Sequence, residues 1–158
     1  MIIALALFGV GQYQKNLHND DFTMDKVNIT VGEIYSAYSI KQSEYCDYVY
    51  NVNNTLYKCE NNSFSADKIR ELRKRTELNK VVKYPVIYNK ANPKLNFILN
   101  IELNDSLELG NTLSNEMISE EILKSRVKYT YVKSASTDKD DLSDYMEFIT
   151  NANNVYKQ

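Results

Sequence analysis

The sequence predicts an α+β protein: an antiparallel β-meander or small open barrel with an inserted basic helix and a C-terminal helix, preceded by an N-terminal hydrophobic helix. Apolar and aromatic residues alternate with polar ones in short runs between residues 27 and 103, which favours strands. Helical spacing of apolar residues appears over 65–79 and 138–156. The order of these segments is not a regular βαβ alternation, so an antiparallel sheet is expected.

The chain divides into an N-terminal hydrophobic helix at 1–19, anchor-like or signal-like, and a single α+β domain at 20–158. Residues 2–10 are apolar, about half of the ~20 residues that a spanning helix needs, and they fit the hydrophobic region of a signal peptide better. A shortened membrane helix and a buried helix of a soluble domain stay open as alternatives. This apolar run predicts a cell-envelope protein, membrane-anchored or periplasmic, with a cytoplasmic location as the alternative.

The strands begin with the β-branched and aromatic stretch from Val27 to Ile40. Tyr45 to Tyr50 follows as a strong strand, and Leu56 to Cys59 returns as its partner. Asn53 and Asn54 predict a two-residue type I′ turn between them, because Asn tolerates positive φ. This turn pairs Tyr50 with Tyr57 and Tyr48 with Cys59. One face of the hairpin therefore carries Cys46, Tyr48, Tyr50, Tyr57 and Cys59.

The remaining elements follow in order. Ser65 is a good N-cap for a helix over 65–79, whose apolar stripe is Ile69, Leu72 and Thr76. Strands are expected at 81–88, 95–103 and 127–132, and helices at 115–124 and 138–156. Pro85 lacks a backbone donor, so it predicts that its strand is an edge strand or carries a bulge.

Cys46 and Cys59 are a candidate disulfide. In the predicted register they are diagonal neighbours, at or beyond the ~4.4–6.8 Å Cα separation that a disulfide requires, so a bridge needs a bulge or a register change. The alternative is two reduced, buried thiols. No Cys-x-x-Cys motif occurs, which argues against zinc binding and thioredoxin-like chemistry.

Two groups of residues are candidates for binding. A basic cluster lies along the helix at 65–79 and just after it, and it predicts attraction to an acidic partner or an anionic membrane surface. Its members are Lys68, Arg70, Arg73, Lys74, Arg75, Lys80 and Lys83. The alternative is a solvated helix face with interspersed carboxylates. Tyr48, Tyr50 and Tyr57 could form an amphipathic recognition face, with core packing as the alternative for the tyrosines.

Several classes of function are disfavoured. The net charge of −2 gives no basic field for nucleic acid, and a single His makes His-centred catalysis improbable. No P-loop, dinucleotide fingerprint or nucleophile elbow occurs. The acidic run that starts at Asp138 has Ser143 and Ile149 where a calcium loop needs Gly and Glu. We therefore expect no enzyme activity, no cofactor and no metal.

Three segments resemble a family of small bacterial membrane-associated β-meander domains of unknown function. They are Val31 to Ile34, the hairpin YVYNVNNTLY at 48–57, which resembles a "Y-x-V-N-G-x-x-Y" pattern, and YPVIYNKANP at 84–93, which resembles a "V-x-Y-x-P-x-N-P" pattern. Asn54 replaces the usual turn Gly, and residues 63–80 resemble an insertion. The resemblance implies a membrane-associated β-meander and no catalytic residues.

The sequence thus favours a non-enzymatic, envelope-associated accessory or protein-interaction domain. Its partner would be a protein, with the membrane surface as a further contact through the N-terminal helix and the basic helix. The alternative is an immunity-type inhibitor that binds and blocks a toxin enzyme. The sequence does not set the oligomeric state.

Overall fold

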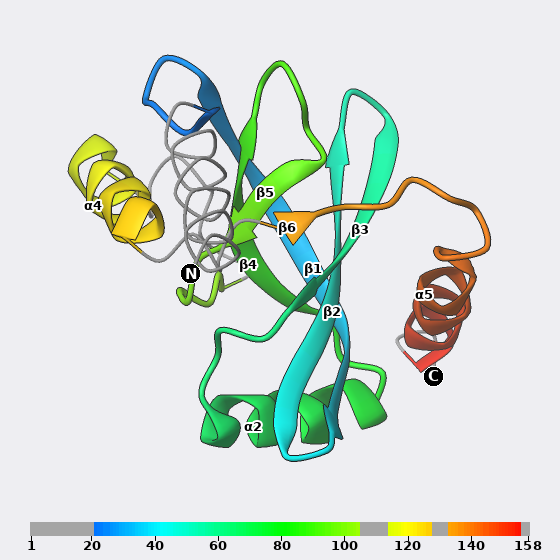
Figure 1. The fold of residues 1–158 in the computed structure, drawn as a ribbon. Helices are drawn as coiled ribbons and strands as arrows, with labels where there is room; N and C mark the ends of the chain where they lie inside the picture. The colour runs from blue at the N-terminus through cyan, green and yellow to red at the C-terminus, as the bar shows by residue number, and fades with distance from the viewer. Residues whose placement is uncertain (1–20, 105–113, 128–132, 156–158) are drawn as a thin grey trace, which may run out of the picture.

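The computed structural model describes residues 21–104, 114–127 and 133–155, and they form one antiparallel sheet with helices around it (Figure 1). The strand order is β3-β2-β1-β4-β5-β6. This confirms the predicted α+β fold with an antiparallel meander. The strands are β1 (Val27–Ile40), β2 (Ser43–Val52), β3 (Thr55–Asn61), β4 (Val82–Asn89), β5 (Leu95–Ile98) and β6 (Lys133–Ser134).

The sheet curls into a half-barrel whose two edges are joined by the segment around β6 (Figure 1). β6 pairs with β5, and Ser136 just after it exchanges two backbone hydrogen bonds of 2.8 Å with Lys58 of β3. Gly32 allows the close approach that this curvature requires. A Cβ at Gly32 would lie 2.5 Å from Cγ2 of Val86, closer than any real contact.

The hairpin between β2 and β3 has the predicted turn and register. Asn53 and Asn54 have φ of 51° and 65°, as a type I′ turn requires. Tyr50 pairs with Tyr57 and Tyr48 with Cys59, which confirms the predicted pairing. The side-chain face that these residues share is thereby confirmed as well.

A second tight turn, between β1 and β2, has no Asn or Gly. Lys41 and Gln42 take φ of 46° and 69° there. Within β1 the register against β2 shifts between Ile34 and Ser36, so Tyr35 is the extra residue of a bulge. Ile34 and Ala37 both lie in the interior, while Tyr35 points to the outer surface.

The inserted helix is α2 (Ala66–Glu77), and it packs at one end of the half-barrel (Figure 1). Ser65 caps it, because its hydroxyl accepts a hydrogen bond of 3.3 Å from the Lys68 amide. Ile69, Leu72 and Thr76 are buried, as the sequence predicts. The first two belong to the main core, which fills the interior of the half-barrel.

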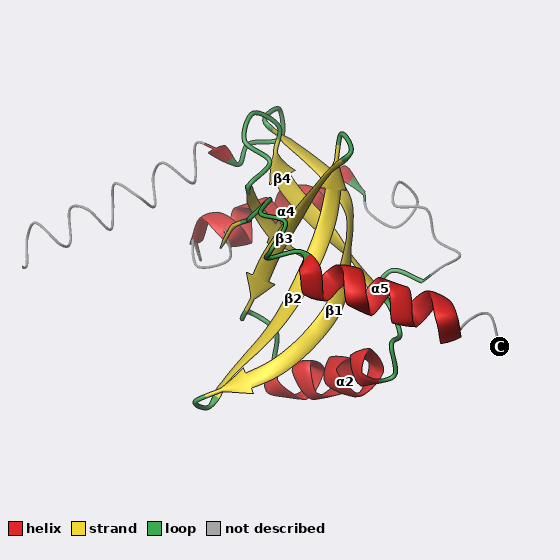
Figure 2. Ribbon diagram, turned by 90° about the vertical axis from the view of Figure 1, so that its right-hand side faces the viewer, coloured by secondary structure: helices red, strands yellow, loops and turns green. Residues whose placement is uncertain are grey.

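Two further helices cover the outside of the sheet. α4 (Asn115–Val127) places Ile118 against an outer cluster around Phe97 and Ile87. α5 (Ser143–Val155) lies across β1 and β2 and packs Phe148 against Tyr35 and Val49 (Figure 2). α5 confirms the predicted C-terminal helix, although it starts later, after turns over 138–142.

The interpretation of Pro85 as an edge or bulge residue is wrong, because β4 lies between β1 and β5. The Pro85 carbonyl accepts a hydrogen bond of 2.9 Å from the Leu99 amide, so the backbone polar groups of Pro85 face the β5 side. Strand β5 pairs with β4 only opposite residues 86–88. The proline therefore stands just past the paired segment, where its missing donor costs no ladder bond.

Some predicted elements lie outside the described residues: the N-terminal hydrophobic helix at 1–19 and most of the strand at 127–132. The predicted strand at 95–103 is shorter than expected, since β5 ends at Ile98. Beyond it, the Leu99 amide donates to the Pro85 carbonyl and an isolated bridge joins Leu103 to Lys83. Among the described residues, no helix has the length and apolar character needed to cross a membrane.

Candidate functional site: the outer face of the β1–β3 sheet

The tyrosines predicted as a recognition face lie inside the half-barrel. Tyr48 and Tyr50 are 0% and 1% exposed, and Tyr57 is half-buried and stacks on Tyr50 with ring centroids 5.3 Å apart. The Tyr48 hydroxyl donates to Asn96 Oδ1 at 2.5 Å, and the Tyr50 hydroxyl donates to the Pro93 carbonyl at 2.6 Å. Because their rings and hydroxyls are used in the core, Tyr48 and Tyr50 do not form an exposed surface.

Cys46 and Cys59 belong to the same interior and are reduced thiols in the structure, the alternative to the predicted disulfide. Asn61 Nδ2 donates to Cys46 Sγ at 3.8 Å, and Asn96 Nδ2 donates to Cys59 Sγ at 3.6 Å. Burial raises the pKa of the Cys46 thiol to about 12. A buried thiol with a raised pKa is a poor nucleophile, so the pair acts as core packing here.

The basic residues of α2 are largely matched by carboxylates of the same chain. Glu102 accepts from Arg75 at 2.7 Å and from Lys68 at 3.3 Å. Arg73 pairs with Glu44 at 3.1 Å and also donates to the Ser39 hydroxyl and the Ala37 carbonyl. Arg70 pairs with Asp67, while Lys74 is exposed. Three members of the predicted basic cluster, Lys68, Arg73 and Arg75, therefore pair with carboxylates outside α2 and help to hold the helix in place. Lys80, like Lys74, is exposed.

A different set of residues gathers on the outer surface of β1, β2 and β3. We call it the Tyr38 face; it consists of Tyr38, Tyr45, Asp47, Lys58 and Glu60. The Tyr38 hydroxyl lies within hydrogen-bond distance of two carboxylates, Asp47 Oδ1 at 3.1 Å and Glu60 Oε2 at 2.7 Å. Asp47 and Glu60 are direct partners across the β2–β3 pair. Two like charges thus stand opposite each other and share one hydroxyl proton.

The aromatic part of the Tyr38 face is a stacked ring pair. Tyr38 and Tyr45 are cross-strand partners, with ring centroids 5.7 Å apart and an interplanar angle of 19°. Both residues are partly exposed, unlike Tyr48 and Tyr50. The Tyr38 face therefore presents aromatic surface beside two carboxylates.

The electrostatics of the Tyr38 face are unbalanced toward negative charge. Burial raises the pKa of Asp47, and the nearby Glu60 and Asp144 carboxylates raise it further. The opposing effects come from Lys58, whose Nζ is 4.0 Å from Asp47, and from the Tyr38 hydroxyl. One lysine thus faces two carboxylates that already repel each other.

Tyr35 of β1 has a buried hydroxyl beneath α5. Tyr35 is 5% exposed and packs against Tyr145 and Phe148, but its hydroxyl has no hydrogen-bond partner among the described residues. Burial raises the pKa of Tyr35, and so do the carboxylates of Asp47, Asp144 and Asp141. The Tyr35 hydroxyl is therefore enclosed between β1 and α5, within the electrostatic influence of the nearby carboxylates.

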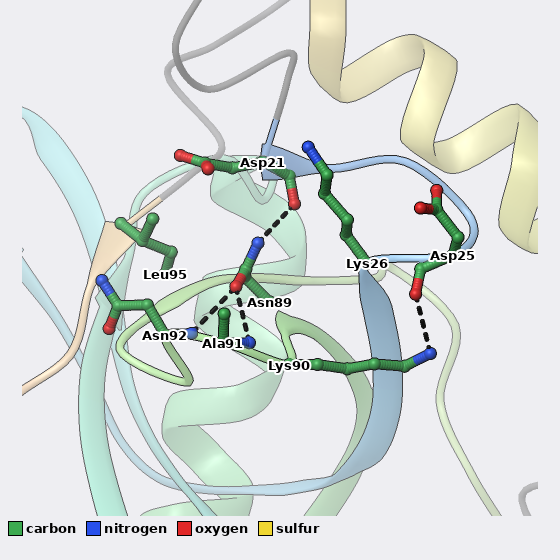
Figure 3. Close-up of a pocket in the computed structure, with 8 residues that line it drawn as sticks. All are labelled: Asp21, Asp25, Lys26, Asn89, Lys90, Ala91, Asn92 and Leu95. Atoms are coloured by element: carbon green, nitrogen blue, oxygen red, sulfur yellow. Dashed lines mark hydrogen bonds between the residues drawn. The ribbon is translucent and has the colours of Figure 1, made fainter.

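A shallow pocket lies at the start of β1, beside the turn over 89–95 (Figure 3). Its central side chain is Asn89, which donates to the Asp21 carbonyl at 2.6 Å and accepts from the Ala91 and Asn92 amides at 2.9 and 2.8 Å. The Lys90 ammonium donates to a backbone carbonyl across the pocket at 2.9 Å. These hydrogen bonds tie the turn to the segment just before β1, so the residues that line the pocket have a structural role.

In the part of the chain that the structure describes, no three His, Cys, Asp or Glu side chains are placed to hold a metal. The acidic run near α5 forms turns, where Asp138 Oδ1 accepts from the Asp140 amide at 2.9 Å. The Tyr38 face is therefore the arrangement that most needs a functional explanation.

Comparison with known proteins adds no family: no family model, no curated protein and no solved structure matches this chain. The sequence resemblance to membrane-associated β-meander domains therefore stays a prediction. Function has to be argued from the geometry of the Tyr38 face.

Proposed function

We propose that this chain is a non-enzymatic protein-interaction domain that binds a positively charged partner surface with the Tyr38 face. The observation that carries the proposal is the Asp47–Glu60 pair. Like charges directly opposite each other on paired strands destabilise a sheet. A basic partner would remove that repulsion on binding, so the pair makes sense as a recognition element.

The composition of the Tyr38 face supports protein binding. Tyrosine is enriched at interfaces, since it offers a large contact area and loses little conformational entropy. Tyr38 and Tyr45 are stacked before any partner arrives, and Tyr38 is also held by hydrogen bonds to carboxylates. A preorganised surface has less ordering cost when it binds.

The second candidate is an immunity-type inhibitor of a toxin enzyme. The surplus of carboxylates on the Tyr38 face favours it, because an acidic surface can cover an active site that is lined with basic residues. The two candidates differ in outcome. An inhibitor abolishes the activity of its partner at a one-to-one ratio, whereas an accessory domain leaves that activity in place.

Envelope association is a separate proposal that rests on the apolar run at residues 2–10. Its test is fractionation of cells that produce the full chain. Recovery in the membrane or periplasmic fraction supports it, and recovery only in the cytosol contradicts it.

Site-specific photo-crosslinking tests the binding surface. A photoreactive phenylalanine analogue replaces Tyr45 in the full chain, and the same analogue replaces Lys74 on α2 as the exposed control. We expect a discrete adduct from position 45 in cells, which weakens when Asp47→Asn and Glu60→Gln are added. Mass spectrometry should place the attachment in a basic segment of the partner.

Two results would contradict the proposal. One is an adduct from position 74 with none from position 45. The other is an adduct from position 45 that the double neutralisation leaves unchanged. Circular dichroism of each variant confirms that the sheet is intact before the adducts are compared.

A further inference from the structure

We infer that the Tyr38 face is a receptor for one arginine side chain of the partner, with the guanidinium between Asp47 and Glu60 and its plane against the Tyr38–Tyr45 ring pair. This inference rests on the proposed function and names the group that would anchor the partner. It concerns the β1–β3 surface at the edge of α5.

The first argument is the number of charges. Asp47 and Glu60 each carry a negative charge when ionised, and Lys58 supplies one positive charge at 4.0 Å from Asp47. On α5, Asp144 adds a further negative charge that acts on Asp47. Asp47 and Glu60 against Lys58 leave one uncompensated negative charge on the Tyr38 face, which one additional cation would balance, and Asp144 favours that cation further.

The second argument is the hydrogen-bonding capacity of the two carboxylates. The Tyr38 hydroxyl has a single proton, so it can donate fully to only one of Asp47 and Glu60 at a time. Both carboxylates keep free lone pairs on a surface where Asp47 is only 15% exposed through its side chain. A donor-rich cation would satisfy both.

The ring pair selects arginine over lysine. Guanidinium is planar and weakly hydrated, and it stacks on aromatic rings while forming paired hydrogen bonds to carboxylates. An ammonium is a compact, strongly hydrated charge that gains less from the Tyr38 and Tyr45 rings. The combination of aromatic surface and paired carboxylates therefore fits guanidinium better.

The test uses small probes of stated chemistry. N-acetyl-arginine amide and N-acetyl-lysine amide are titrated separately into the ¹⁵N-labelled full chain and followed by amide chemical shifts. We expect saturable shifts for residues of β1, β2 and β3 near Tyr38, Asp47 and Glu60. The arginine derivative should saturate at a several-fold lower concentration than the lysine derivative.

Variants assign the binding to the named groups. Asp47→Asn and Glu60→Gln should each weaken the arginine derivative by about tenfold, as expected for the loss of a hydrogen bond to a charged group. Tyr45→Ala should weaken it, and Tyr45→Phe should not, since the ring is what matters there. Glu77→Gln, an exposed carboxylate on α2, is the matched control and should change nothing.

The inference is overturned if the two probes bind equally, if the shifts spread over all acidic surface residues, or if neither neutralisation weakens binding. Glu60 is exposed, so its variant decides the matter if Asp47→Asn perturbs the fold. The crosslinking result is separate. An adduct at position 45 without arginine selectivity leaves protein binding standing and removes only the arginine receptor.

Discussion

Tyr48 and Tyr45 lie three residues apart on β2, one inside the half-barrel and the other on its outer face. Inside, the hydroxyls of Tyr48 and Tyr50 each have their own acceptor: Asn96 for Tyr48 and the Pro93 carbonyl for Tyr50. Outside, one hydroxyl, that of Tyr38, is shared by two carboxylates that repel each other. These two interior hydroxyls are satisfied one by one, whereas the Tyr38 face keeps unused acceptors.

The two groups of tyrosines therefore have different roles. Tyr48 and Tyr50 stabilise the fold, and Tyr38 and Tyr45 form part of an exposed surface. A one-to-one match of donors and acceptors is expected of a core, because an unsatisfied buried group destabilises the folded state. The Asp47–Glu60 pair is only partly compensated, by the Tyr38 hydroxyl and Lys58, so its mutual repulsion opposes folding. The outer arrangement is therefore better explained by a ligand than by folding.

Truncating one tyrosine on each side gives the largest expected contrast. Tyr48→Ala should lower the free energy of unfolding by about 3–5 kcal/mol, as for other large aromatic side chains removed from a core. Tyr45→Ala should lower it by less than about 1 kcal/mol, the range of a cross-strand pair. Urea denaturation followed by circular dichroism measures both. Equal losses would contradict the distinction between the two faces.

The basic side chains of α2 differ from the Tyr38 face, because Arg75 and Lys68 share a carboxylate partner, Glu102. Burial acts to raise the pKa of Glu102, but hydrogen bonds and charge from Arg75 and Lys68 outweigh it and leave that pKa below its ordinary value. Glu102→Gln leaves both cations without their shared partner, so we expect a loss of about 1–2 kcal/mol, less than for a fully buried pair.

The pH dependence gives a second readout of the same pair. Because the folded pKa of Glu102 is lowered, its contribution is present above the unfolded value near 4.5 and is lost as the pH falls through the folded value. The Gln variant should lack this acid-dependent loss. Glu77→Gln, which is exposed on α2, should stay within about 0.5 kcal/mol of wild type.

The sequence could predict the features that depend on local chemistry. Asn53 and Asn54 favour positive φ, so the turn and the β2–β3 register followed from them. Ser65 and the spacing of Ile69 and Leu72 likewise defined α2. The turn at 41–42 escaped prediction because Lys and Gln have no preference for positive φ.

The position of the Tyr38 face could not be predicted from local sequence, because it depends on contacts between distant segments. The run YCDYVY at 45–50 has tyrosine on both faces, so alternation groups the residues but does not say which group is inside. Packing against β4, β5 and α2 decides it. In the same way, Arg73 and Arg75 find their carboxylates 29 and 27 residues away, at Glu44 and Glu102, which no helix pattern reveals.

Asp47→Asn has the smallest expected effect on stability and is the sharpest test of the comparison. Burial and the neighbouring carboxylates raise the folded pKa of Asp47, so its contribution is favourable below the unfolded value near 3.8 and is lost as the pH rises through the folded value. Ionised Asp47 therefore lowers the stability of the folded state at neutral pH. The Asn variant should be as stable as wild type or up to about 1 kcal/mol more stable there, by urea denaturation at pH 7. A clear destabilisation would mean that Asp47 holds the sheet together. Unchanged or increased stability with weaker arginine binding would mean that its charge serves the partner instead.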